Sequence, residues 1–425
     1  MSCGLASDRA RPLPQAILAT LGDEGFRLFF PLAALYAALF PALWVIAWGF
    51  DLPLARDVPP SLWHAHEMLI GAFGAALIGF VTTAAPEWTD TEPPRGPPLW
   101  TLAGLWAVGR VVGLFGWDAI GLAGAVADLV WMTALTVWLI ALSVRRKTDR
   151  LLAFVFWLAV LAACTAAGRL GFATGDLTLA TMGIHLSGFA FLGLLGLALS
   201  RITVPVTNLV LDPTERTSPF RPHPGRLHLA PGLVLVAMAG ELLGASPAVS
   251  AWLLIAAGAA FMDRVGEAFI GRDAARAEIL MLAGSSALAG IGLILVGAAR
   301  LGAPWTEVTG LHMAFMGGLG LGIYAVFCIA GLLHTDRPLG LSRSLKGGAL
   351  FLVLSVVLRV APEFGVSVLG SAHLVASLSW FAAFTIWVSA NWRFLSQVTE
   401  TKNPGQAAEK TAMPERSALY WEAAE

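Results

Sequence analysis

Three histidines in this chain are followed by small residues at five and eight positions further on, and both small residues are glycine in two of the three copies. The two close copies and one looser copy are His66 with Gly71 and Gly74, His312 with Gly317 and Gly320, and His185 with Ala190 and Gly193. Small residues at helical spacing let a flat macrocycle or a neighbouring helix approach closely. The pattern therefore indicates either a haem-bearing helix or close helix packing.

Other potential ligands accompany these histidines. Met68, Met182 and Met316 stand three or four positions from His64, His185 and His312, respectively. Thioether and imidazole together suit copper(I) or haem iron, although methionine is also an ordinary core residue.

His64 and His66 differ by about 200° around a helix, so they cannot easily bind one metal from a regular helix. Glu67 lies on the His64 face, where it could orient an imidazole or carry a proton.

The composition is that of a membrane protein. The 425 residues are 57% hydrophobic and only 13% charged, and they include 16 Trp and 45 Gly. Soluble domains carry about a quarter of charged residues. A net charge of -1 gives no basic field for binding nucleic acid. Lipid is therefore the expected solvent for this chain.

The cysteines exclude several metal motifs. Cys3, Cys164 and Cys328 are far apart and form no CxxC or CxxCH arrangement. This argues against a zinc ribbon, a thioredoxin motif and covalently attached c-type haem. A haem in this chain would therefore be held non-covalently, as the expected haem b is.

Apolar runs long enough to cross a bilayer fill most of the chain. The predicted spans are 26–50, 64–86, 97–116, 117–143, 151–171, 178–200, 229–246, 247–262, 278–299, 309–333, 347–365 and 370–396. We expect an all-α integral membrane protein of about twelve transmembrane helices. Its parts are a cytoplasmic segment at 1–25, one membrane domain at 26–398 with a central cytoplasmic loop at 201–228, and a polar cytoplasmic tail at 399–425. The first span has no cleavage site and is expected to be retained.

The charge distribution predicts the orientation. Of 27 Lys and Arg residues, only Arg56 and Arg300 fall in the loops on one side, and three arginines fall within spans. The rest lie in the loops and ends on the other side. Since cytoplasmic loops are rich in Lys and Arg, both chain ends are expected inside the cell. The eighth span, 247–262, is the shortest. If this segment does not cross the membrane, every later span would run in the opposite direction.

This orientation brings the polar groups to one depth. His64, His66, His185, His312 and His373 all lie near the outer ends of even-numbered spans. Arg110, Arg169 and Arg359 lie late in odd-numbered spans, at a similar level. Ionisable groups within spans are costly and usually face a cavity or a partner. The five histidines are candidate metal ligands, and the arginines are candidate partners for an anionic group. Single residues of these types also occur as interfacial or interhelical pairs.

Three histidines are interpreted as structural. His334 lies at the opposite end of its span, and His223 and His228 lie in the central loop. The interval of four spans between His66, His185 and His312 raises the hypothesis of three related four-helix units.

Several motifs resemble those of one family. Residues 63–68 read WHAHEM and residues 86–89 read PEWT. Further matches are Arg201 with Pro205, Thr207 and Asn208, the pair Leu311 and His312, and residues 334–338, which read HTDRP. These stretches resemble the NnrS family over nearly the whole chain. Glu87 and Asp336 depart from the Asn and Gly that are usual in this family.

The resemblance implies a haem- and copper-containing protein of the bacterial cytoplasmic membrane that acts in the response to nitric oxide and in nitrosative stress. His64, His66 and His312 would bind the cofactor, with His185 and His373 as further metal ligands. Arg110, Arg169 and Arg359 would contact haem propionates, and Glu67 would move protons. If the protein reduces nitric oxide, it needs an electron donor such as quinol.

The helix and histidine layout is also similar to haem-copper oxidases and nitric oxide reductases. The adjacent His-His copper pair of those enzymes is missing, and no Tyr follows a His at four residues. Two alternatives stay open: a secondary transporter, which twelve spans with a central loop would suit, and a haem-based nitric oxide sensor without turnover.

Overall fold

The computed structural model describes residues 14–50, 58–114, 121–368 and 370–397. Helices dominate this part of the chain, and no strand occurs in it. The first half contains α1 (Pro14–Leu21), α2 (Gly25–Phe50), α3 (Pro60–His66), η1 (Glu67–Phe73), α4 (Gly74–Thr89), α5 (Pro97–Leu114), α6 (Gly121–Arg146), α7 (Leu152–Thr174) and α8 (Leu177–Leu211).

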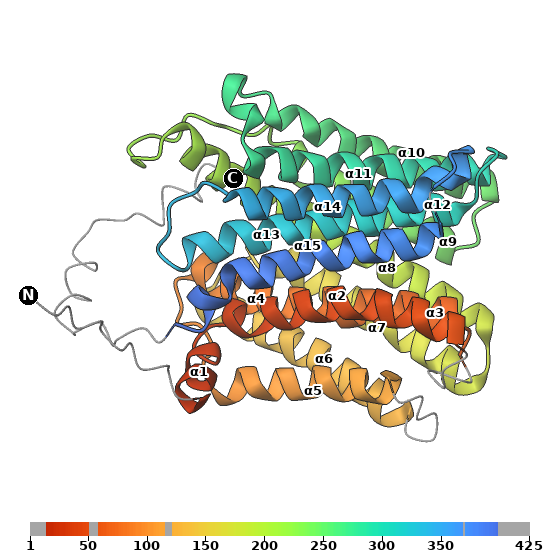
Figure 1. Ribbon diagram of the computed structural model, residues 1–425, viewed down its shortest axis with the longest axis horizontal. Coiled ribbons are helices and arrows are strands. Elements are labelled where there is room, and N and C mark those ends of the chain that lie inside the picture. The colour runs from red at the N-terminus through yellow and green to blue at the C-terminus, as the bar shows by residue number, and fades with distance from the viewer. Residues whose placement is uncertain (1–13, 51–57, 115–120, 369, 398–425) are drawn as a thin grey trace, which may run out of the picture.

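The second half continues the same bundle. It contains α9 (Arg226–Leu242), α10 (Pro247–Asp263), the short η3 (Arg264–Ala268) and η4 (Gly271–Ala275), α11 (Ala277–Arg300), α12 (Glu307–His312), η5 (Met313–Leu319), α13 (Gly320–Leu333), α14 (Arg343–Val360), η6 (Ala361–Phe364) and α15 (Ala372–Leu395). The long helices run roughly parallel to one axis (Figure 1).

The expectation of a multi-pass, all-α membrane protein is confirmed. Ten helical stretches in the described residues are long and apolar enough to cross a membrane. The remaining two predicted spans correspond to α5 and α9, which have 18 and 17 residues and pack in the same bundle. The short eighth span is the full helix α10, whose start is capped by the Ser246 side chain with Pro247 in its first turn.

One predicted boundary is wrong. The central loop was expected to begin at residue 201, but α8 continues to Leu211 and the loop spans residues 212–225. The helix continues because residues 202–211 are largely apolar, and Pro205 is accommodated within it. The predicted tail after 399, most of the segment before 25 and the loop that contains Arg56 lie outside the described residues.

Contacts between loops show that the Lys- and Arg-rich segments share one end of the bundle. Each contact joins an arginine to a different loop or helix end: Arg27 with Leu395, Arg146 with Asp90, Arg201 with Arg150, Arg226 with Asp263, Arg276 with Leu339 and Arg337 with Asn391. The start of α2 and the end of α15 therefore lie together, as an even number of crossings requires. Arg300 lies at the opposite end, where it pairs with Glu241 and Glu307.

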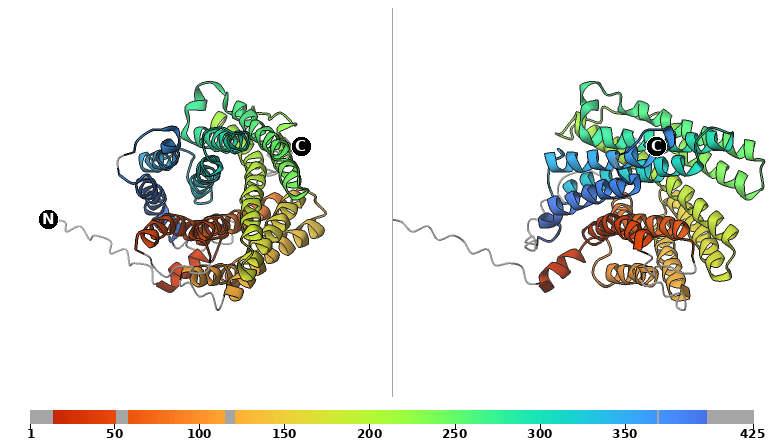
Figure 2. Two further views of the ribbon diagram at one scale, coloured as in Figure 1. Left: turned by 90° about the vertical axis from the view of Figure 1, so that its right-hand side faces the viewer. Right: turned by 45° about the vertical axis from the view of Figure 1, so that its right-hand side comes forward.

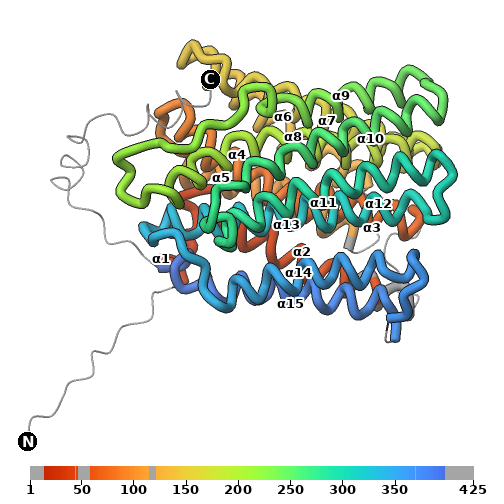
Figure 3. Tube along the Cα trace, turned by 90° about the horizontal axis from the view of Figure 1, so that it is seen from above, coloured from red at the N-terminus to blue at the C-terminus, as the bar shows by residue number. Residues whose placement is uncertain are grey.

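Figure 3 shows α3 and α12 together at this opposite end, far from α1. In the end-on view of Figure 2, α14 and α15 complete the bundle beside α2. The contact of α15 with α2 includes a hydrogen bond of 2.8 Å from the Trp380 indole to the Ala37 carbonyl. One large hydrophobic cluster along the bundle makes up most of the core, and Phe40 and Trp63 form a small second cluster.

The repeated His-Gly-Gly motif marks a repeated local structure. After His66 and after His312, the helix changes to a seven-residue π-helix, η1 or η5, and returns to α-helix at Gly74 or Gly320. The looser copy at His185 lies in the uninterrupted α-helix α8. The π segment therefore distinguishes the two close copies from the third.

The π segments use side-chain donors from neighbouring helices. The Trp106 indole donates to the Gly71 carbonyl at 2.8 Å, and the Ser285 hydroxyl donates to the Gly318 carbonyl at 2.7 Å. Backbone groups within a bilayer need such internal partners because no water reaches them. The space beside the motif glycines is filled by neighbouring helices, since a methyl group at Gly71 would lie 2.5 Å from the Tyr36 ring and one at Gly320 would lie 2.6 Å from Trp380.

Candidate functional site

Four of the five candidate histidines line one cavity of about 360 Å³ at the end opposite the arginine-rich loops. We call it the histidine cavity, and its polar lining consists of His64, His185, His312, His373, Arg359 and two serines, Ser61 and Ser377. Met68, Met316, Phe73, Phe315 and Trp380 supply much of its apolar wall. A mostly apolar cavity of this size with a few convergent polar groups is typical of a cofactor or ligand site.

Helix ends bring these histidines together. His64 comes from α3, His185 from α8, His312 from the end of α12, and His373 from the first turn of α15. The start of α15 is fixed by its cap, because the Ser371 hydroxyl accepts from the Leu374 amide. Predicted spans two, six, ten and twelve therefore converge here, as their histidine depth indicated.

His312 is oriented for ligation. Its Nδ1 lies 2.8 Å from the Val308 carbonyl oxygen, so in the neutral ring Nδ1 carries the hydrogen and Nε2 keeps its lone pair. Metal-ligating histidines commonly donate their other ring nitrogen to a carbonyl in this way. The His64 ring is held differently, since it stacks on Phe40 with the planes 11° apart.

His66 faces away from this cavity. Its Nδ1 lies 3.0 Å from Glu67 Oε1, and its Nε2 lies 3.8 Å from Asp128. The angular argument that separated His64 from His66 is therefore confirmed. The two neighbours serve different regions of the molecule.

The region around His66 is a buried ionic cluster, which we define as Tyr36, His66, Glu67, Arg110, Asp128 and Arg169. Arg110 lies 2.9 Å from Glu67 and 3.0 Å from Asp128. Arg169 also pairs with Asp128, and the Tyr36 hydroxyl donates to Glu67. Two carboxylates and two guanidinium groups balance one another, so the cluster meets the rule that buried charges are paired.

Several predicted roles change with this geometry. Glu67 was expected on the His64 face, where it could orient an imidazole or carry a proton. The turn that opens η1 instead brings it to the His66 imidazole, Arg110 and Tyr36. Arg110 and Arg169 neutralise protein carboxylates in the cluster, whereas Arg359 lies in the histidine cavity. Met68 and Met316 line the cavity, but Met182 is an exposed residue outside its lining.

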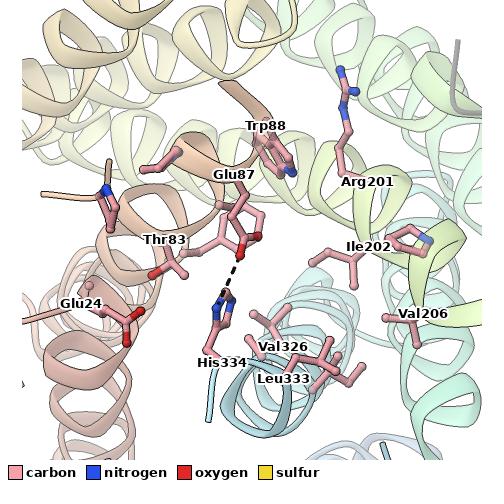
Figure 4. A pocket seen from close by; sticks show the side chains of 18 of the residues that line it. Glu24, Thr83, Glu87, Trp88, Arg201, Ile202, Val206, Val326, Leu333 and His334 are labelled. Atoms are coloured by element: carbon pink, nitrogen blue, oxygen red, sulfur yellow. Dashed lines mark ion pairs between the residues drawn. The ribbon is translucent and has the colours of Figure 1, made fainter. Parts of the chain in front are cut away.

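Sequence reasoning missed a second large cavity. It has a volume of about 720 Å³ and lies at the arginine-rich end, between α4, α8 and α13 (Figure 4). We call it the Glu87–His334 cavity after two side chains in its wall, whose His334 Nδ1 and Glu87 Oε1 atoms lie 3.5 Å apart. His334 was interpreted as structural, yet it lines this cavity together with Arg201 and Trp88. The signal was the set of motifs that end spans two, six and ten.

Metal-ligand geometry limits what the histidine cavity can hold. No group of three or more His, Cys, Asp or Glu side chains in the described part of the chain is placed to bind a single metal ion. A haem needs only one or two axial imidazoles, and His312 fits that requirement. The residues therefore suit axial haem ligation better than a three-ligand copper site.

The fold and the cavity define a multi-pass helical membrane protein with a histidine-lined ligand site. The family follows from sequence comparison: residues 20–398 match the family model described as NnrS protein, so the chain belongs to the NnrS family. Membership implies a role in the nitric oxide response. No curated protein matches the chain in sequence.

Proposed function

We propose that this protein holds a b-type haem in the histidine cavity and binds or reduces nitric oxide there, in the cytoplasmic membrane of a bacterium. The observation that carries the proposal is the convergence of four histidines and Arg359 on one cavity. A bound haem would supply an iron centre that takes nitric oxide as a ligand and exchanges electrons with it.

The residues have distinct tasks in this proposal. His312 would hold the haem iron through Nε2, because the Val308 carbonyl engages Nδ1 and fixes the ring. Arg359 neutralises a propionate, because guanidinium groups pair well with carboxylates. His64, His185 and His373 complete the polar wall, where they would help to hold the haem or donate hydrogen bonds to nitric oxide.

The apolar wall suits a small apolar gas. Phe73, Phe315 and Trp380 exclude water and leave room for nitric oxide to enter from the lipid. The positive-inside rule places this cavity near the outer face of the membrane, because the arginine-rich loops lie at the other end.

Reduction would follow 2 NO + 2 e⁻ + 2 H⁺ → N₂O + H₂O. The proposal for a proton-carrying Glu67 loses support, because that carboxylate is engaged by Arg110 and Tyr36 outside the histidine cavity. Copper as a second metal has no three-ligand group to support it in the described residues.

The transporter alternative is disfavoured by the middle of the bundle. A carrier needs polar groups for its substrate near the membrane midplane. Between the two cavities lies a small space lined by apolar residues and Gly322, among them Leu77, Phe191 and Ile323. A sensor that binds nitric oxide without turnover would use the same histidine cavity.

Spectroscopy of the purified full-length protein tests the proposal. We expect a Soret band, an iron content of at least about one atom per chain, and a spectral shift when nitric oxide is added to the reduced protein. His312→Ala should lose most of the Soret absorbance, whereas His228→Ala on α9 should keep it. A purified protein without a Soret band, or equal haem content in both variants, would overturn the proposal.

A further inference from the structure

The Glu87–His334 cavity and the histidine cavity lie along shared helices: α2 lines both, whereas α14 and α15 line only the histidine cavity. α4, α8 and α13 line it at the arginine-rich end, while η1, α8 and η5 line the histidine cavity at the other end. The small apolar space between them shares Phe73 with the histidine cavity and Phe80 and Val326 with the Glu87–His334 cavity. One helix set therefore connects the two cavities through an apolar zone.

The deeper wall of the Glu87–His334 cavity is aromatic and aliphatic. It is formed by Phe30, Phe80, Trp88, Ile202, Val326 and Ile329. Figure 4 shows Trp88 and Ile202 on facing helices, with Val326 on a third. Such a wall favours a flat apolar ring over a small hydrophilic ion.

The polar groups stand at one side of this cavity. His334 Nδ1 lies 3.5 Å from Glu87 Oε1, and the Glu87 side chain is 54% exposed. The His334 ring stacks on Phe26 with ring centres 5.0 Å apart, which fixes its plane. A neutral imidazole and a carboxylate can each accept a hydrogen bond from a hydroxyl group and then take its proton.

The charges of the cavity disfavour an anionic ligand. Its lining includes Glu24, Glu87, Asp90 and Glu215, against Arg95 and Arg201. Arg201 is also engaged, because it donates to the Arg150 carbonyl and lies 6.0 Å from the Trp88 ring centre. A neutral ligand with hydroxyl donors meets these conditions better than a phosphate or a carboxylate.

We propose that the Glu87–His334 cavity binds a hydroquinone, whose ring packs on the aromatic wall and whose hydroxyl group donates to the Glu87–His334 pair. The claim that this site supplies electrons rests on the proposed function, whereas the claim that it binds a hydroquinone does not. The volume of about 720 Å³ exceeds that of a bare ring and leaves space for the start of an isoprenoid chain.

The redox step balances with the proposed reaction. A hydroquinone becomes a quinone as its two O–H bonds break, releasing two protons and two electrons. Glu87 and His334 accept the protons and pass them to water at the arginine-rich end. A haem held in the histidine cavity would take up the two electrons, which match the two that reduce two molecules of nitric oxide. The described residues that line the apolar zone between the cavities carry no proton-conducting side chain, so the quinol protons leave at their own end and the two protons for nitric oxide reduction come from water at the other end.

Equilibrium binding of decylubiquinone and its quinol to the purified full-length protein tests the site. Wild-type protein should bind the quinol saturably, and Glu87→Leu or His334→Leu should bind the quinol about tenfold more weakly, as expected for the loss of one hydrogen bond. His228→Leu on α9, outside the cavity, is the matched control and should bind like wild type. Because the leucine variants could disturb folding, Glu87→Gln and the cavity-filling Ile202→Trp provide second tests, and both should weaken binding.

The result also separates this inference from the proposed function. His312→Ala should lose haem and keep quinone binding. Wild-type protein that is purified without haem and still binds saturably would overturn the haem proposal and leave the quinone site intact. Failure of wild type to bind, or equal affinity in all cavity variants, would overturn the quinone site and leave the haem proposal standing.

Discussion

The two sides of the α3–η1 segment carry similar polar side chains in different surroundings, one facing a cavity and the other facing charged protein groups. On one side, His64 faces the histidine cavity beside Arg359. On the other side, His66 and Glu67 face Arg110 and Asp128 in the ionic cluster, where each charge has a protein partner. The difference teaches that a buried polar group indicates a ligand site only when its neighbours leave it space for the ligand.

The largest expected effect in this comparison is a loss of stability in the ionic cluster. Arg110→Met removes the cation that lies within 3.0 Å of both Glu67 and Asp128. Breaking a buried pair leaves uncompensated charge, so we expect the free energy of unfolding to fall by about 3–5 kcal/mol. Denaturant titration in mild detergent measures this change.

The control for Arg110→Met is Arg226→Met, which breaks a more exposed pair with Asp263. Exposed pairs contribute only about 0–1 kcal/mol. If the two variants lost equal stability, the ionic cluster would not be the structural counterpart of the histidine cavity.

A smaller effect is expected from the glycine that lets α2 approach the cluster. In Gly71→Ala the new methyl group would lie 2.5 Å from the Tyr36 ring, so Tyr36 must move away from Glu67. Overpacking of this kind costs about 1–3 kcal/mol. Thermal unfolding of the purified variant measures the loss.

Gly104→Ala on α5 is matched to this variant, because a methyl group there meets nothing within 4 Å. Its stability should rise by about 0.5–1 kcal/mol, since Ala is the better helix former. A Gly71→Ala protein as stable as wild type would mean that the close approach of Tyr36 is not needed.

How much of this contrast the sequence predicts depends on the residue. Hydropathy and charge identify the spans and their common end, and the helical angle between His64 and His66 separates their environments. The convergence of His64, His185, His312 and His373 was expected from depth alone. Pairing within the cluster was not, because sequence spacing on separate helices does not fix which arginine meets which carboxylate.

The Glu87–His334 cavity escaped sequence reasoning for a related reason. Its walls come from the start of α2 and the ends of α4, α8 and α13, which are far apart in the chain. Hydropathy treats each of these ends as a boundary, and only packing shows that the boundaries enclose a space. The π segments were equally hidden, because glycine spacing is compatible with α-helix as well.

The smallest effect is expected far from both regions, in the loop after α8. The hydroxyl and amide groups of Thr214 and Thr217 donate to the Asp212 carboxylate and lower its pKa from the usual value. Its contribution to loop order is therefore present above the unfolded pKa and is lost as the pH falls through the folded pKa. Limited proteolysis of the loop should speed up at acidic pH, whereas Asp212→Asn should be cleaved quickly at all pH values. If the wild-type loop were cleaved at the same rate at acidic and neutral pH, the Asp212 carboxylate would not be needed to order the loop.

The paired π segments also bear on how the protein can change over evolutionary time. Each π turn accommodates an additional residue compared with an α turn, so it resets the angular phase between the helix halves on either side of it. Substitutions that re-aim side chains around His64 or His312 need not rotate α4 or α13. The two ends of each helix can therefore diverge as separate modules, with one end adapting to its ligand while the other keeps its packing.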